Sequence, residues 1–254
     1  HIPIGLADSL DSLKTFVEPE GCFSPGFATY GVCFILQDAA GKVNAPTAPG
    51  VSCSHTLMDP GYLVPRFSWA TDQVTVQMQL SQVEVKAPGG PLQVVSATVA
   101  LSNEIPSPVK VSLYVLLRPL GPAGGDVRRL AVSDKGDALL ADGHPAVIAL
   151  APCDGAAVTA TDIADAPALL AAKDRSAESP TGDCAGWLRF DMTLQPRTTP
   201  ILHVVCPVLP GRRAVAHQWD GKSQWAQFDL AKPNPASGGQ LQPSPPLDFY
   251  RKLS

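Results

Sequence analysis

The chain is poor in charge and has no long apolar run, and each shortage argues against a class of function. Only 17% of its 254 residues are charged, the formal net charge is -4 and the pI is about 5.7. Such a chain has no positive field to hold a phosphate backbone, so we expect no nucleic-acid partner. No run of about 18 apolar residues occurs, so we expect no membrane-spanning helix.

Cysteine is too sparse for the fold to depend on a disulfide scaffold. Six are present: Cys22, Cys33, Cys53, Cys153, Cys184 and Cys206. In an oxidising compartment two local pairs are plausible, Cys22 with Cys33 and Cys153 with Cys184, because each would close a loop-rich segment. The alternative is buried thiols, since Cys33 and Cys206 lie in apolar, strand-like runs where cysteine behaves as a small hydrophobe. The residues leave both readings open.

The motifs of common catalytic sites are missing as well. There is no Gly-x-Ser-x-Gly elbow, and the glycine-rich segment 121–125 lacks the lysine and the helix of a phosphate loop. Cys53 and His55 have no second pair at metal-ligand spacing, so we expect no metal and no cofactor. The few glutamates lie at turns or on polar strand faces, while His144 occupies a turn and His203 an apolar strand. The sequence therefore predicts no catalytic residue.

Strand-like alternation is what the chain has in abundance. In residues 92–103 and again in 109–118, apolar side chains recur at every second position, as in a half-buried strand. Pro106 and Pro108 separate the two runs and remove backbone donors there, which is typical of a turn. We predict that the two runs form a long antiparallel hairpin.

The rest of the chain predicts mostly short strands. They are expected near residues 30–37, 43, 67–69, 74–85, 127–133, 138–141, 145–150, 187–194 and 199–208. Residues 44–62 are expected to form a long surface connection, and 169–172 a helical turn within an excursion that is hard to interpret. The predicted fold class is all-β: a supersandwich of two large antiparallel sheets, with at most one or two short helices.

A proline-rich segment near the C-terminal end indicates where the domain ends. We predict a single β-supersandwich domain over 1–231, and a proline-rich linker over 232–254 that leads to an absent C-terminal, helical domain. The first ten residues lack the basic and apolar regions of a signal peptide. We therefore expect a mature protein or an excised part of a longer polypeptide.

The best binding signal lies near the C-terminal end, where two tryptophans flank polar residues. Exposed aromatic rings can stack on the apolar faces of sugars while polar neighbours bind the hydroxyls. The alternative is that both rings cover a sheet edge or fill the core. A weaker candidate on the same logic is Trp69 with Arg66. The candidate carbohydrate-binding residues are Trp219, Trp225, His217, Asp220, Trp69 and Arg66.

Three segments resemble a known domain family: EPEGCFSPGFATYGVCFIL at 18–36, VSLYVLLRPLGPAGGDVRRLAV at 111–132 and DGHPAVIAL at 142–150. They are similar to the N-terminal β-supersandwich, galactose-mutarotase-like domain of large bacterial glycoside-hydrolase-like proteins. The catalytic part of those proteins is an (α/α)6 barrel of the six-hairpin type. The resemblance covers most of residues 16–150.

The resemblance implies a role without catalysis. In such proteins the acid and the base reside in the helical barrel, which this chain lacks, and the β domain packs against it. We therefore expect a structural, carbohydrate-contacting domain of a secreted or periplasmic glycoside-hydrolase-like polypeptide. Its expected partners are a carbohydrate and the missing helical domain. An aldose mutarotase-like enzyme and a stand-alone carbohydrate-binding module are the alternatives, although no histidine and glutamate pair typical of mutarotases is identifiable.

Overall fold

The structure, a computed structural model, is an all-β protein. Strands make up 57% of the residues and helices 4%, which confirms the predicted fold class. The one named helix, α1, spans Ala166–Leu170. The residues described are 2–6, 13–49, 51–59, 62–87, 90–162, 165–208, 215–219, 225–229, 248 and 251–252. No helix among them is long and apolar enough to cross a membrane.

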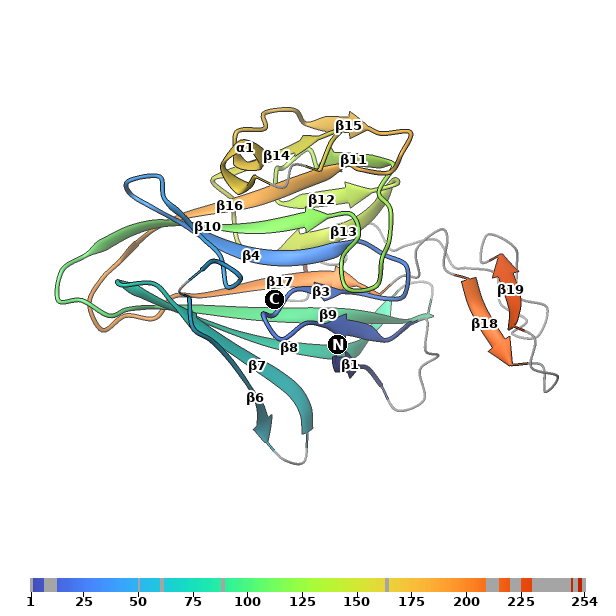
Figure 1. The fold of residues 1–254 in the computed structure, drawn as a ribbon, viewed down its shortest axis with the longest axis horizontal. Coiled ribbons are helices and arrows are strands. Elements are labelled where there is room, and N and C mark those ends of the chain that lie inside the picture. Colours follow the sequence, from blue (N-terminus) through green and yellow to red (C-terminus); the bar gives the residue numbers. More distant parts are fainter. Residues whose placement is uncertain are drawn as a thin grey trace.

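The first sheet has eight strands in the order β1-β2-β3-β4-β10-β16-β14, with β5 paired to β4. Its strands are β1 (Ile2–Ile4), β2 (Thr15–Val17), β3 (Phe23–Ser24), β4 (Gly31–Asp38), β5 (Val43–Asn44), β10 (Val109–Arg118), β14 (Gly155–Thr159) and β16 (Ala185–Leu194). The sheet lies over one side of the second sheet (Figure 1).

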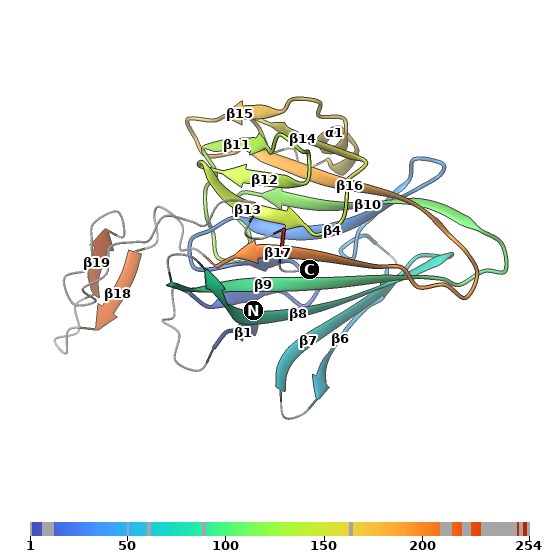
Figure 2. The same cartoon turned by 180° about the vertical axis from the view of Figure 1, so that it is seen from behind.

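The second sheet has nine strands in the order β15-β11-β12-β13-β17-β9-β8-β7-β6. Its strands are β6 (Cys53–Asp59), β7 (Tyr62–Ala70), β8 (Val74–Ala87), β9 (Gly90–Asn103), β11 (Arg129–Val132), β12 (Ala138–Ala141), β13 (His144–Ala149), β15 (Ser176–Glu178) and β17 (Ile201–Pro207). Both views show β6 and β7 diverging from the body of the sandwich (Figures 1 and 2). A separate two-stranded sheet consists of β18 (Val215–Trp219) and β19 (Trp225–Asp229).

The core lies between the two sheets and is formed by the alternating apolar positions. Leu113, Val115 and Leu117 of β10 are fully buried from the first sheet, and Val76 and Leu80 of β8 from the second. Burial of each such side chain contributes about 1.5–3 kcal/mol. The apolar side chains that alternate in the sequence therefore form the contact between the two sheets.

The predicted hairpin over 92–118 is wrong, because its two strands belong to different sheets. β9 pairs with β8 and β17, whereas β10 pairs with β4 and β16. The Asn103 side-chain amide donates to the carbonyls of Ser107 (2.8 Å) and Leu194 (3.0 Å), and so fixes the crossing. Alternation alone suits both arrangements, since each strand turns one apolar face to the same core. The long hairpin is β8–β9 instead, paired from Val74↔Asn103 to Ala87↔Gly90.

Two further segments differ from the prediction. The expected surface connection 44–62 contains β6, an edge strand whose described side chains after Cys53 are exposed and therefore show no alternation. The excursion contains β14 as well as α1. The helix begins at Ala166, three residues before the start of the expected helical turn at 169–172. Trp187 Nε1 donates to the Leu169 carbonyl at 3.2 Å and anchors α1 on the outer face of the first sheet. The β11–β12–β13 meander and the later strands β16 and β17 are confirmed.

All six cysteines are thiols in the structure, and Cys184 and Cys206 are buried. The suggested pairing of Cys153 with Cys184 is wrong. Cys153 precedes β14 and Cys184 precedes β16, and these strands run antiparallel with Gly155 opposite Arg189. The two cysteines therefore lie at opposite ends, more than about 13 Å apart, which no disulfide spans. Burial raises the pKa of Cys153 to about 12.

Most of the predicted linker 232–254 lies outside the described residues. Within its last residues, the guanidinium of Arg251 donates to both carboxylate oxygens of Asp137 at 2.6 and 2.7 Å. Asp137 lies just before β12, so the described residues near the C-terminal end rest on the second sheet.

Candidate functional site

The β18–β19 pair, which we call the tryptophan hairpin, brings the main predicted binding positions together. In the β18–β19 register Trp219 lies opposite Trp225, and His217 lies opposite Gln227. Positions directly opposite one another, and those two residues along, share a face of an antiparallel pair. The backbone therefore places the two tryptophan positions and the His217 position on one face. Asp220 lies outside the described residues, and carbohydrate binding here stays a prediction.

The weaker candidate, Trp69 with Arg66, does not form a site. Trp69 is only 3% exposed and belongs to the core between the sheets. Arg66 is exposed and lies at the opposite parity along β7, so the two residues are on opposite faces. A buried ring cannot stack on a sugar, and the prediction that the two act together is wrong.

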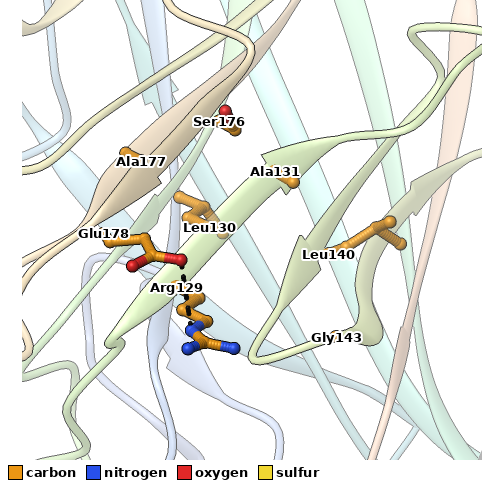
Figure 3. A pocket seen from close by; sticks show the side chains of 8 residues that line it. All are labelled: Arg129, Leu130, Ala131, Leu140, Gly143, Ser176, Ala177 and Glu178. Carbon is orange, nitrogen blue, oxygen red and sulfur yellow. Dashed lines mark ion pairs between the residues drawn. The ribbon is translucent and has the colours of Figure 1, made fainter.

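A depression of about 410 Å³ lies over β15, β11 and β12 (Figure 3). Its polar groups are Arg129, Ser176 and Glu178, and Leu130 and Leu140 are among its apolar ones. Arg129 Nε lies 3.3 Å from a Glu178 oxygen, with both side chains mostly exposed. Glycoside hydrolysis needs two carboxyl groups about 5–9.5 Å apart, and one carboxylate lines this depression. The depression can receive a polar group but has no acid and base pair.

A row of polar side chains crosses the outer face of the first sheet; we call Gln37, Ser112, Tyr114, Arg189 and Asp191 the outer polar row. Ser112 lies opposite Gln37 on one side and Asp191 on the other. The Ser112 hydroxyl donates to Asp191 at 2.6 Å, and the Tyr114 hydroxyl donates to Gln37 at 3.2 Å. The row therefore joins three neighbouring strands, β4, β10 and β16.

The carboxylates of this surface already have partners. Asp191 Oδ1 lies 3.3 Å from Arg189 Nε, and the Asp191 backbone N–H donates to Asp154 Oδ2 at 2.7 Å. Arg189 also donates to the Asp154 carbonyl at 3.2 Å. Such groups can meet sugar hydroxyls, and the Asp154 and Asp191 carboxylates are each held by hydrogen bonds from their neighbours. The alternation shows that Ser112 and Tyr114 face away from the core, whereas their partners come from distant segments that the sequence could not connect.

Two loops pack backbone against backbone at one end of the sandwich. A Cβ on Gly121 would lie 2.2 Å from Gly31 Cα, and a Cβ on Gly125 would lie 2.2 Å from the Thr29 carbonyl carbon. Only glycine permits these approaches. Leu120, at a φ of 54°, is 73% exposed on the same loop. The loops belong to the sequence segments that carry the family resemblance, and they present an apolar residue to solvent.

The histidines with described side chains are His55, His144 and His203. His203 Nδ1 lies 3.2 Å from the Thr98 hydroxyl, and no ion pair among the described side chains includes His55, His144 or His203. No group of three potential metal ligands occurs among them either.

Solved structures share this architecture. A comparison with solved structures finds 31 matching chains, among them a bacterial glucoamylase in complex with acarbose. That match has a TM-score of 0.51 and 11% identity, and covers 73% of this chain and 28% of that chain. This chain has the β-sandwich fold found in part of that glucoamylase.

A proposed kojibiose phosphorylase from the human microbiome matches more weakly, with a TM-score of 0.38 and 8% identity over 69% of this chain and 21% of that chain. No protein-family model matches, and no curated protein matches. The chain spans less than a third of the length of either structure. The resemblance inferred from the sequence is thus confirmed at the level of the sandwich fold.

Proposed function

We propose that this chain is a non-catalytic β-supersandwich domain of a secreted or periplasmic carbohydrate-active polypeptide, where it supports a helical catalytic domain and contacts carbohydrate. The observation that carries the proposal is the fold match, which covers 73% of this chain but only 28% of the glucoamylase chain. A domain of this kind leaves the catalytic groups to the rest of its polypeptide.

The described side chains support the same conclusion from chemistry. General acid–base catalysis needs a group within hydrogen-bond reach of the proton that it moves, and hydrolysis of a glycoside needs two carboxyl groups. In the depression Glu178 is engaged by Arg129, and on the outer face Asp191 is engaged by Ser112 and Arg189. We expect the natural polypeptide to continue past Ser254 into a helical domain, which the sequence of its gene would show.

The carbohydrate contact is assigned to the tryptophan hairpin. Two aromatic positions that face one another across β18 and β19, with His217 two residues along, suit a platform on which a sugar ring stacks. The outer polar row is the second surface with suitable groups, since its hydroxyl, amide and guanidinium groups can bind sugar hydroxyls.

The first test asks whether the isolated chain has activity. We expect no release of glucose from soluble starch or maltose, and no acceleration of the mutarotation of glucose or galactose in a polarimeter. Mutarotation by the purified chain that is lost in His203→Ala or His217→Ala would overturn the proposal in favour of an aldose mutarotase.

The second test asks whether the chain binds carbohydrate. Native electrophoresis through gels that contain soluble starch should retard the protein, and Trp219→Ala with Trp225→Ala should remove the retardation. The loss of stacking should weaken acarbose binding about tenfold. Phe27→Ala, which removes an exposed ring elsewhere, is the matched control and should behave as the parent. Unchanged retardation of the double variant, with loss in Arg189→Ala, would move the contact to the outer polar row.

A further inference from the structure

Cys22 and Cys33 occupy facing positions across two neighbouring strands. The β3–β4 register pairs Phe23 with Val32, and its continuation by one residue beyond the end of β3 places Cys22 opposite Cys33. Facing residues of an antiparallel pair have Cα atoms about 4.5–5.5 Å apart. Disulfides require Cα separations of about 4.4–6.8 Å. Continuation of the register therefore brings these two cysteines within the range of Cα separations that a disulfide needs.

The side chains meet as well. The neighbouring thiol of Cys33, together with burial, raises the pKa of Cys22, as expected for two thiols close to one another. Both residues are partly exposed. Cβ atoms of facing residues lie about 4.5–5.5 Å apart, against about 3.5–4.5 Å in a disulfide. Formation of the bridge therefore requires the two Cβ atoms to approach one another by about 1 Å.

We propose that Cys22 and Cys33 form a disulfide when the protein reacts with an oxidising disulfide. This bond would link the residue that precedes β3 to β4. A thiolate of the pair attacks an external disulfide, forms a mixed disulfide and releases one external thiol. The second cysteine then attacks the protein sulfur of the mixed disulfide and releases the other external thiol. In sum, two protein thiols and one external disulfide give one protein disulfide and two external thiols.

The other cysteines do not have this arrangement. The Cys53 thiol donates to the Pro19 carbonyl at 3.6 Å. The Cys184 thiol donates to the Arg128 carbonyl at 3.4 Å, and Cys206 is fully buried. The bridge would therefore be specific. It would also close the loop that carries Phe27 and packs against Gly121 and Gly125.

The first test counts and maps thiols in the whole chain after equilibration with oxidised glutathione. Thiol titration under denaturing conditions should fall from six to four. Trypsin releases both cysteines in the peptide 15–42, which contains no internal lysine or arginine. That peptide should lose about 2 Da and resist alkylation until it is reduced. Chymotryptic cleavage within it should leave its halves joined. Six remaining thiols, stable mixed glutathione adducts or a different linked pair would overturn the proposal.

The second test uses thermal unfolding. A bridge that closes a loop of about a dozen residues should raise the Tm of the oxidised chain by about 5–10 °C, and dithiothreitol should reverse the rise. Cys22→Ser or Cys33→Ser should abolish both the rise and the mass change. Cys53→Ser and the double variant Cys153→Ser/Cys184→Ser should retain both. A rise that persists without Cys22 would refute the assignment, and the mapping of the parent protein decides the matter even if a variant fails to fold.

Discussion

The ion pair of Asp137 with Arg251 allows a direct test of whether the C-terminal end is held on the sandwich. The two side chains are joined by two hydrogen bonds and are 16% and 20% exposed. Asp137 also accepts a bond of 2.7 Å from the Ser133 hydroxyl, and Arg251 contacts Asp248. Removal of Arg251 therefore leaves Asp137 with one side-chain donor in a partly buried site.

The magnitude follows from the strength of charge-assisted hydrogen bonds. Such bonds contribute about 1.5–3 kcal/mol each when shielded from water, and partial exposure reduces the value for this pair to about 1–2 kcal/mol in total. Arg251→Ala and Asp137→Asn should each lower the free energy of unfolding by that amount, and the Tm by about 2–6 °C. The double variant should lose little more than either single one, because both remove the same interaction.

The pH dependence has a definite sign. The hydrogen bonds from Arg251 are the largest cause that lowers the pKa of Asp137 below its ordinary value of 3.8. Because the folded pKa lies below the unfolded one, the stabilisation is present above the unfolded pKa and is lost as the pH falls through the folded pKa. Between pH 5 and pH 2, the parent should therefore lose more stability than Asp137→Asn does.

Urea unfolding of the four proteins, followed by circular dichroism at pH 7 and at steps toward pH 2, measures these quantities. Lys252→Ala, which changes an exposed neighbouring charge, serves as the control and should shift the midpoint only slightly. A coupling energy below about 0.3 kcal/mol, the error of additivity, would show that Arg251 does not hold the C-terminal end on Asp137.

Two other predictions concern stability. Gly125→Ala should lower the free energy of unfolding by about 3 kcal/mol or more, because its Cβ would meet backbone atoms of the facing loop. Gly124→Ala, which has open space around it but a φ of 71°, should lower it by about 1 kcal/mol. Equal losses in thermal melts would contradict this reasoning. Gln82→Ala should cost about 2–3 kcal/mol in urea unfolding, since Gln82 bonds the buried Thr15 hydroxyl at 2.7 Å, whereas Gln93→Ala should cost less than half as much.

Some residues of the candidate site could be predicted from the sequence, and others could not. The polar residues between Trp219 and Trp225 lead to the prediction that the two tryptophans act together, and the register places their positions opposite one another, while carbohydrate binding there stays a prediction. Trp69 was misassigned, because an aromatic residue in an alternating strand has the same local sequence whether its ring faces water or the core. Asp191 and Arg189 were missed, since only strand pairing brings them beside Ser112.

The sequence by itself determined the all-β class, because period-two alternation is a local property that each strand carries in its own side chains. Which strand pairs with which was decided only by tertiary structure. β9 and β10 each turn an apolar face to one core, and the choice between one sheet and two facing sheets depends on the other strands available to pair with them. Cys22 and Cys33 show the same limit: their spacing allowed a bridge, but only the register between β3 and β4 makes them neighbours. Local patterning is set by nearby residues, whereas pairing is set by contacts between segments far apart in the chain.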